Sequence, residues 1–98
     1  MFVGAMSLDL RLGDVHSLKE KRSVVRPIIA DLRRTFTVAV AEAGHLDLHR
    51  RALVGVAVVA PDRAHCVEVL EACERKVADL PEVELLSARQ HFISSDDD

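Results

Sequence analysis

The fold is decided by FVGAMSLDLRL (residues 2–12) and, after a short break, by SLKEKRSVVRPIIADLRR (residues 17–34). In the first segment apolar residues recur at every second position, which predicts a β-strand with one buried face. In the second they recur at helical spacing, which predicts an amphipathic helix. Ser17 and Glu20 form a capping box at its start. The apolar stripe stays in phase across Pro27, so we expect one kinked helix there.

The rest of the chain repeats these two periodicities. Residues 35–43 and 50–60 predict two strands, joined by a loop over 44–49. Asp62 is placed to cap a second helix, Pro81 ends it, and residues 82–92 predict a fourth strand. The order βαββαβ predicts an α+β, ferredoxin-like split fold, in which a four-stranded antiparallel sheet carries both helices on one face. Right-handed crossovers would place the first and third strands in the centre.

Length and composition fit one domain. The chain of 98 residues can build one two-layer core, and its 49% hydrophobic residues exclude global disorder. We expect a single domain over residues 1–93 and a disordered acidic tail over residues 94–98. The excess of 16 acidic over 13 basic residues equals the three aspartates at positions 96–98. Net charge therefore favours no class of partner, and only the local distribution of charge can.

The cysteines and the lack of long apolar runs indicate the compartment. No apolar run reaches the ~18–20 residues that a membrane span needs, so no membrane association is expected. Cys66 and Cys73 lie seven residues apart in a helical pattern, which is about 10 Å of rise and too far for a disulfide. Both fall in the apolar stripe, so we expect two buried thiols in a cytoplasmic protein.

The first predicted helix carries the strongest functional signal. Four cations, Lys19, Arg22, Arg26 and Arg33, fall in one stripe that contains no acid, and Lys21 adds charge on the opposite shoulder of the apolar face. The stripe spans about 21 Å, long enough to follow several phosphates of RNA. We predict that these five residues bind RNA or a protein partner. The alternative is a solvated helix face whose long side chains shield the edge of the core.

The open face of the predicted sheet offers a second interpretation. Ferredoxin-like sheets that bind single-stranded RNA stack bases on aromatic residues of that face. Here the candidates on the first strand are small or polar, namely Val3, Ala5, Ser7, Asp9 and Arg11. Any RNA would therefore be held through phosphates and shape. A small, flat, apolar face is alternatively a dimer surface, which would make the protein a regulatory or oligomerisation module, with or without a small ligand.

Catalytic and metal-binding patterns are weak. His45, Asp47 and His49 are possible metal ligands by type, but their spacing suits a helix whereas this segment is predicted to be a loop. We therefore interpret them as polar loop residues. No local spacing suggests a Ser/His/Asp or Cys/His catalytic group. We expect a non-catalytic protein without metal or cofactor.

The segment Ser17-Leu18-Lys19-Glu20-Lys21-Arg22-Ser23-Val24-Val25 strongly resembles the most specific motif of the YlxP-like family of small bacterial proteins. Residues 40–42 and 51–57 match as well, and the similarity covers residues 1–92. The resemblance implies a ferredoxin-like fold and points to Lys19, Lys21 and Arg22. In this family the gene commonly lies near those for transcription elongation, translation initiation factor two and ribosome-binding factor A. That gene setting implies a role near ribosome assembly or translation. We therefore expect a non-catalytic accessory protein with ribosomal RNA or a ribosomal particle as its partner, and the flat open face leads us to expect a homodimer.

Overall fold

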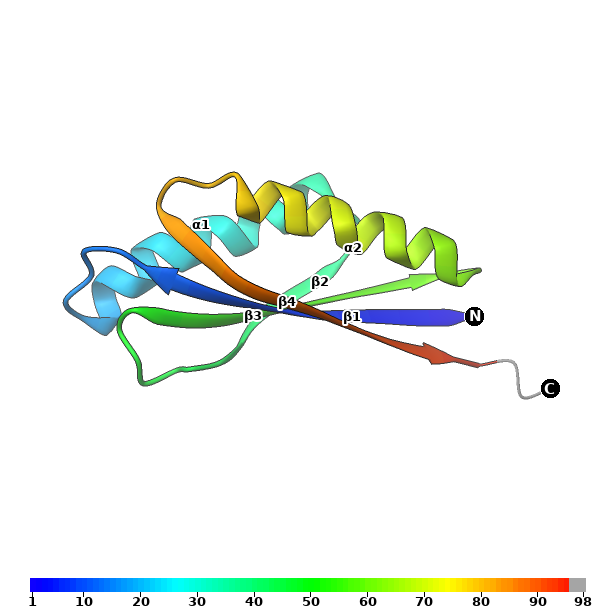
Figure 1. Ribbon diagram of the computed structural model, residues 1–98, viewed down its shortest axis with the longest axis horizontal. Helices are drawn as coiled ribbons and strands as arrows, with labels where there is room; N and C mark the ends of the chain where they lie inside the picture. Colours follow the sequence, from blue (N-terminus) through cyan, green and yellow to red (C-terminus); the bar gives the residue numbers. More distant parts are fainter. Residues whose placement is uncertain (96–98) are drawn as a thin grey trace.

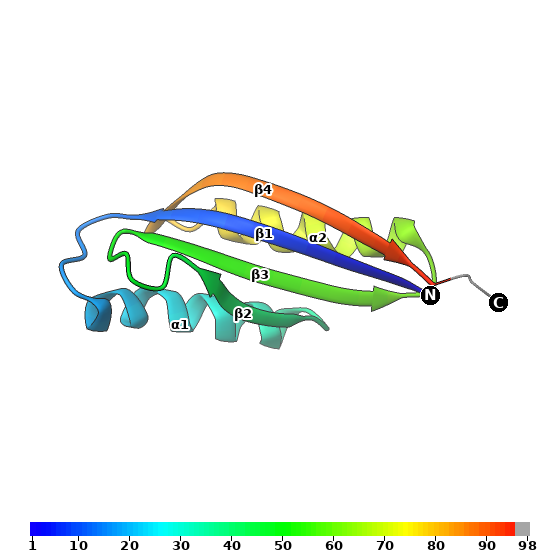
Figure 2. The same ribbon diagram turned by 90° about the horizontal axis from the view of Figure 1, so that it is seen from below.

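The computed structural model describes residues 1–95 and has the order βαββαβ (Figure 1). Its elements are β1 (Phe2–Leu12), α1 (Leu18–Thr35), β2 (Ala39–Gly44), β3 (Arg51–Ala60), α2 (Arg63–Ala78) and β4 (Val83–Ser94). The strands pair antiparallel in the order β2-β3-β1-β4. Both helices cover one face, with α1 on the β2 side and α2 on the β4 side, and the other face is open (Figure 2). The predicted ferredoxin-like fold is confirmed, including the central positions of β1 and β3.

The ends of the strands differ from the sequence predictions. The sequence predicts that the second strand starts at residue 35, but Thr35 belongs to α1, whose last turn closes where the N–H of Phe36 donates to the carbonyl of Leu32. The strand β2 therefore begins only at Ala39. At the other end of the chain, Ser94 pairs with Phe2, and the N–H of Ser95 donates to the carbonyl of Met1 at 2.8 Å. The predicted tail over residues 94–98 is therefore wrong for its first two residues, which pair with the start of the chain. Residues 96–98 lie outside the described part of the chain.

The start of α1 has one of the two contacts of the predicted capping box, with Ser17 as the N-cap. The Ser17 hydroxyl accepts a hydrogen bond from the N–H of Glu20 at 3.0 Å. The Glu20 carboxylate reaches back to the N–H of His16 at 3.2 Å, one residue earlier than a capping box requires. The helix continues through Pro27 as a single element. Its first turn is therefore held by two reciprocal contacts, which fix where the following side chains point.

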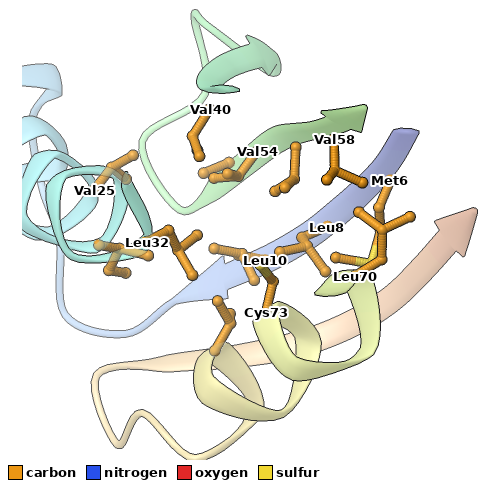
Figure 3. Packing of buried hydrophobic residues seen from close by; sticks show 14 of the residues in the cluster. Met6, Leu8, Leu10, Val25, Leu32, Val40, Val54, Val58, Leu70 and Cys73 are labelled. Atoms are coloured by element: carbon orange, nitrogen blue, oxygen red, sulfur yellow. The ribbon is translucent and has the colours of Figure 1, made fainter. Parts of the chain in front are cut away.

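The core lies between the sheet and the two helices (Figure 3). It is made almost entirely of aliphatic residues, which include Met6, Leu8, Leu10, Val25, Ile28, Leu32, Val54, Val56, Val58, Leu70 and Val77. A methyl group on Gly4 would come within 3.1 Å of both Cys66 Cβ and Leu70 Cδ1, so this glycine lets α2 pack directly on β1. The backbone of β1 and the side of α2 are therefore in close contact.

The two cysteines are free and buried, as predicted. Burial raises the pKa of the Cys73 thiol to about 11. The Cys66 thiol donates to the carbonyl of Phe2 at 3.8 Å. Both thiols therefore serve as small core residues. Across residues 1–95, no helix combines the length and apolar character that a membrane crossing requires.

Replacing Leu70 with alanine tests the packing of α2. Leu70 is fully buried, so Leu70→Ala should lower the free energy of unfolding by about 2–5 kcal/mol through lost contacts and a residual cavity. Leu46, 60% exposed, is the matched control, and Leu46→Ala should change stability by less than about 0.5 kcal/mol. Urea denaturation monitored by far-UV circular dichroism measures both. Equal effects of the two substitutions would contradict the described core.

Candidate functional site

The predicted cationic residues of α1 separate into two groups in the structure. Lys19, Arg22, Arg26 and Arg33 are all exposed and form what we call the basic stripe. The side of α1 that faces the core is marked by Val25, Ile28 and Leu32, which are buried. The fifth predicted residue, Lys21, belongs to this buried side.

The basic stripe runs along the side of α1 next to the edge strand β2. The Arg33 guanidinium donates to the backbone carbonyl of Val40 in β2. On the other side of the helix, Asp31 contacts the Lys76 ammonium of α2 at 3.2 Å. The stripe therefore faces away from α2 and lies beside the outer edge of the sheet.

Three residues of the basic stripe have no acidic partner. Within residues 1–95, Lys19, Arg22 and Arg26 form no ion pair and no side-chain hydrogen bond. By contrast, Arg34 of α1 and Lys76 of α2 both contact the carboxylate of Asp31. The stripe thus concentrates positive charge that the folded chain leaves uncompensated.

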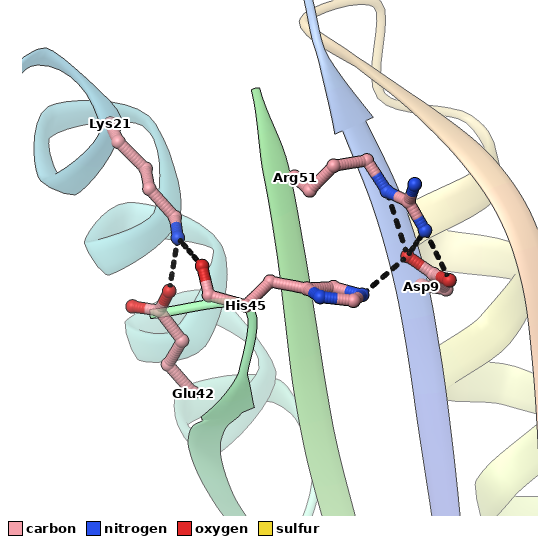
Figure 4. A network of polar contacts seen from close by, with 5 residues as sticks. All are labelled: Asp9, Lys21, Glu42, His45 and Arg51. Carbon is pink, nitrogen blue, oxygen red and sulfur yellow. Dashed lines mark hydrogen bonds and ion pairs between the residues drawn. The ribbon is translucent and has the colours of Figure 1, made fainter. Parts of the chain in front are cut away.

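Lys21 does not contribute to this exposed surface, contrary to the sequence prediction. It is only 2% exposed, and its ammonium lies 2.7 Å from Glu42 Oε2 and donates to the carbonyl of His45 at 2.7 Å (Figure 4). The helical phase of Lys21 directs it toward the core, where its alkyl stem packs at the edge. Its charge is therefore compensated by Glu42 inside the fold and is not available to a phosphate.

Glu42 reaches Lys21 from the inward side of β2, the side that also carries the buried Val40. Within the described chain, the buried Glu42 Oε2 accepts no well-formed hydrogen bond, so the nearby ammonium charge is its compensation. Charges that leave water are stable only when paired. The pair therefore ties α1 to β2 and fixes their separation.

His45 joins this pair to the open face of the sheet. Its backbone has a φ of 56°, in the left-handed region, and its carbonyl accepts from both Lys21 and the N–H of Leu48. Its ring Nε2 lies 3.4 Å from Asp9 Oδ1. Asp9 in turn forms a bidentate ion pair with Arg51, whose Nε donates to Oδ1 at 3.2 Å and whose Nη2 donates to Oδ2 at 2.7 Å. We call Asp9, Lys21, Glu42, His45 and Arg51 the anchoring network (Figure 4).

The histidine pattern in the β2–β3 loop has a structural explanation. The side chain of His45 turns toward Asp9, whereas Asp47 and His49 are exposed on the loop. No group of three or more His, Cys, Asp or Glu side chains suited to a metal ion gathers in the described ranges. The three residues therefore do not converge on one point.

Sequence reasoning missed Glu42 and His45 as partners of Lys21. Two signals pointed toward the contact. Lys21 falls in the phase of the apolar stripe, and Glu42 falls in the inward phase of β2, after Val38 and Val40. A cation and an acid at two such buried phases can neutralise each other across a core. The backbone conformation of His45 had no such signal, because it depends on the loop that surrounds it.

Removing the buried ammonium tests the anchoring network. Lys21→Met keeps the length of the side chain but leaves the Glu42 carboxylate unpaired at a site that is 23% exposed. We expect a loss of about 2–3 kcal/mol in the free energy of unfolding, less than for a fully buried pair because water reaches part of Glu42. The double variant Lys21→Met/Glu42→Met should regain most of this loss. Urea denaturation of the two single variants and the double variant measures the coupling; additive losses would contradict a direct pair.

The Asp9–Arg51 contact predicts a dependence of stability on pH. Hydrogen bonds from Arg51 hold the pKa of Asp9 below its ordinary value. A carboxyl group with a lowered folded-state pKa stabilises the fold above its unfolded pKa, near 3.9, and this stabilisation is lost as pH falls through the folded value. Asp9→Asn should therefore be less stable than the native chain at pH 7, with a smaller difference at about pH 2–3. Denaturation at both pH values, with the exposed-loop variant Asp47→Asn as control, measures this; a difference that grows in acid would refute it.

Comparisons with known proteins identify the family. A family model described as "Protein of unknown function (DUF503)" matches residues 3–90. The uncharacterized protein YlxP of Bacillus subtilis (strain 168) is 29% identical over 90 residues, a match that covers 92% of this chain and 98% of that protein. The match includes the whole of α1, the anchoring network and α2. The chain therefore belongs to the DUF503 family, as its YlxP-like first helix indicates.

Proposed function

We propose that this protein is a non-catalytic accessory protein of ribosome assembly or translation that binds the RNA backbone through the basic stripe. One observation carries the proposal: Lys19, Arg22 and Arg26 are exposed, adjacent and without acidic partners in the described chain. An ordinary solvated helix face mixes charges of both signs. The stripe does not, which favours an anionic partner.

The spacing of the stripe makes an anion favourable. Lys19 and Arg22 are three residues apart, and Arg22 and Arg26 are four apart. Like charges at these helical spacings destabilise a helix by about 0.2–0.5 kcal/mol per pair. A bound phosphate removes this repulsion and adds charge-assisted hydrogen bonds, which the planar guanidinium of arginine forms in bidentate geometry. Binding would therefore relieve a cost that the free protein carries.

Arg33 extends the stripe toward the C-terminal end of α1. One of its guanidinium N–H groups is directed to Val40, and the side chain remains exposed. A guanidinium has five N–H donors, so further donors are free to face an anion. The contact with Val40 holds Arg33 in place and reduces the side-chain entropy that it would lose on binding.

We expect the protein to recognise the backbone and the shape of the RNA, not its bases. The open face of the sheet carries no aromatic side chain on the two central strands β1 and β3, so it offers bases no stacking platform there. Contacts to phosphates position a protein on nucleic acid but carry no sequence information. The resemblance to the YlxP-like family makes ribosomal RNA the first RNA to test. We expect affinity for structured ribosomal RNA with little preference among sequences of the same shape.

Charge reversal on α1 tests this function. Arg22→Glu/Arg26→Glu should abolish binding to ribosomal RNA fragments, because it places two acids in the stripe. For the native chain, log K should fall with log salt with a slope of about −2 to −3.6, as expected for three or four phosphate contacts. The double variant Arg63→Glu/Arg75→Glu makes the same change of net charge on α2 and should retain most of the affinity. Fluorescence anisotropy at several salt concentrations measures all three proteins.

Co-sedimentation with small subunits, large subunits and free ribosomal RNA identifies the particle. Saturable binding to one particle that survives moderate salt, and that is lost in the Arg22→Glu/Arg26→Glu variant, is the expected result. Binding by the reversed variant equal to that of the native chain would refute a role of the stripe. Equal loss in both double variants would indicate a response to net charge alone.

A further inference from the structure

The open face of the sheet ends in an apolar row. Val3 of β1 is paired with Val59 of β3 on one side and with Ile93 of β4 on the other, so the three side chains form a continuous row across three strands. Val59 is 64% exposed and Ile93 is 66% exposed. Single exposed aliphatic residues are normal on a protein surface, but here Val59 and Ile93 flank Val3 and the three form one apolar patch.

The middle of the same face is hollow. The next two rows toward the anchoring network contain only very small side chains over β2, β3 and β1, namely Ala39, Ala57, Ala5, Ala41, Gly55 and Ser7. They line a shallow hollow of about 360 Å³. The apolar row spans β3, β1 and β4, whereas the hollow spans β2, β3 and β1, so the two features share β3 and β1. On β4 the same two rows carry the exposed side chains of His91 and Arg89.

The far end of the face is charged but internally neutralised. Asp9 pairs with Arg51, and Arg11 lies 3.6 Å from Glu84. These pairs lie beyond the hollow, on the rows nearest to the β2–β3 loop. A partner that covers only the apolar row and the hollow would therefore leave the charged end in water.

We propose that a second copy of this chain covers the apolar half of the open face. A two-fold axis that passes near Ala57, perpendicular to the strands and parallel to the sheet, reverses the strand direction in the partner. It places Val59 and Val3 of each copy over Gly55 and Ser7 in the hollow of the other, while Ile93 lies over Arg89 at the β4 edge. Residue i then contacts residue j while j contacts i, which is the reciprocity that a two-fold interface requires. A single sheet face carries both the projection and the depression that this arrangement needs.

The area available predicts a weak dimer. Strands lie about 4.8 Å apart and residues on one face repeat about every 6.8 Å, so three rows across four strands cover roughly 400 Å². A standard interface covers about 800 Å² per partner. The small side chains permit close approach of the two sheets, which usually pack about 10 Å apart. Arg89, which is exposed on the edge strand β4, can extend its guanidinium past the edge into solvent.

Sedimentation equilibrium on the native 98-residue chain tests the dimer. The average mass should rise from that of one chain toward that of two between about 1 µM and about 1 mM, the range of a small transient interface. Val59→Lys places a charge in the partner's hollow and should raise the concentration needed for dimers at least about tenfold. Leu46→Lys makes the same kind of change at the equally exposed Leu46 of the β2–β3 loop, and it should leave dimerisation unchanged. A constant monomer mass, or equal effects of both variants, would overturn the proposal.

Cross-linking locates the axis. The native thiols Cys66 and Cys73 are buried, so Ala57→Cys provides an accessible thiol close to the proposed axis. A short bis-maleimide should join two copies of Ala57→Cys efficiently and two copies of Leu46→Cys poorly. The reverse pattern would overturn the placement of the axis, even if the mass shows a dimer. The basic stripe lies on the other side of the sheet, so loss of RNA binding and loss of dimerisation would be separate results.

Discussion

The arrangement of the basic stripe and of the open face of the sheet depends on the contacts of the Lys21 ammonium. It lies at the edge of the core, where α1, β2 and the loop after β2 come together, and it compensates the charge of the Glu42 carboxylate and donates to the His45 carbonyl. A charge in this position is tolerated only because both partners are in place. The position of α1 over the sheet is therefore specified by a directional contact and not by apolar packing alone.

This contact also explains why two neighbouring lysines of one helix have unrelated roles. Lys19 and Lys21 differ by two positions, which on a helix is more than half a turn. The capping contacts of Ser17 set the rotation of the first turn, so Lys19 points to solvent while Lys21 points inward. A motif rich in lysine and arginine can thus hold one residue that stabilises the fold among others that remain exposed.

The features that the sequence predicted are those that arise from local periodicity. The order of elements, the inward residues of β1 and β3, the caps and the exposed stripe follow from spacing along the chain. The start of β2, the continuation of β4 to Ser94 and the pairing of Ser95 with Met1 depend on partners far away in sequence. The left-handed backbone of His45 occurs together with a carbonyl that accepts hydrogen bonds from both Lys21 and the N–H of Leu48. Such features require the assembled sheet, and no window of sequence encodes them.

The contact between Arg33 and Val40 has a consequence for the association of sheets. The strand β2 lies at the edge of the sheet, and an unprotected edge can pair with strands of other molecules and begin aggregation. The Arg33 guanidinium already donates to the Val40 carbonyl of this strand, and the other cations of the basic stripe lie on the same side of α1. A strand that approached from outside would have to displace Arg33 and enter a positively charged border. The cations of α1 thus protect this edge of the sheet against fibril-like growth.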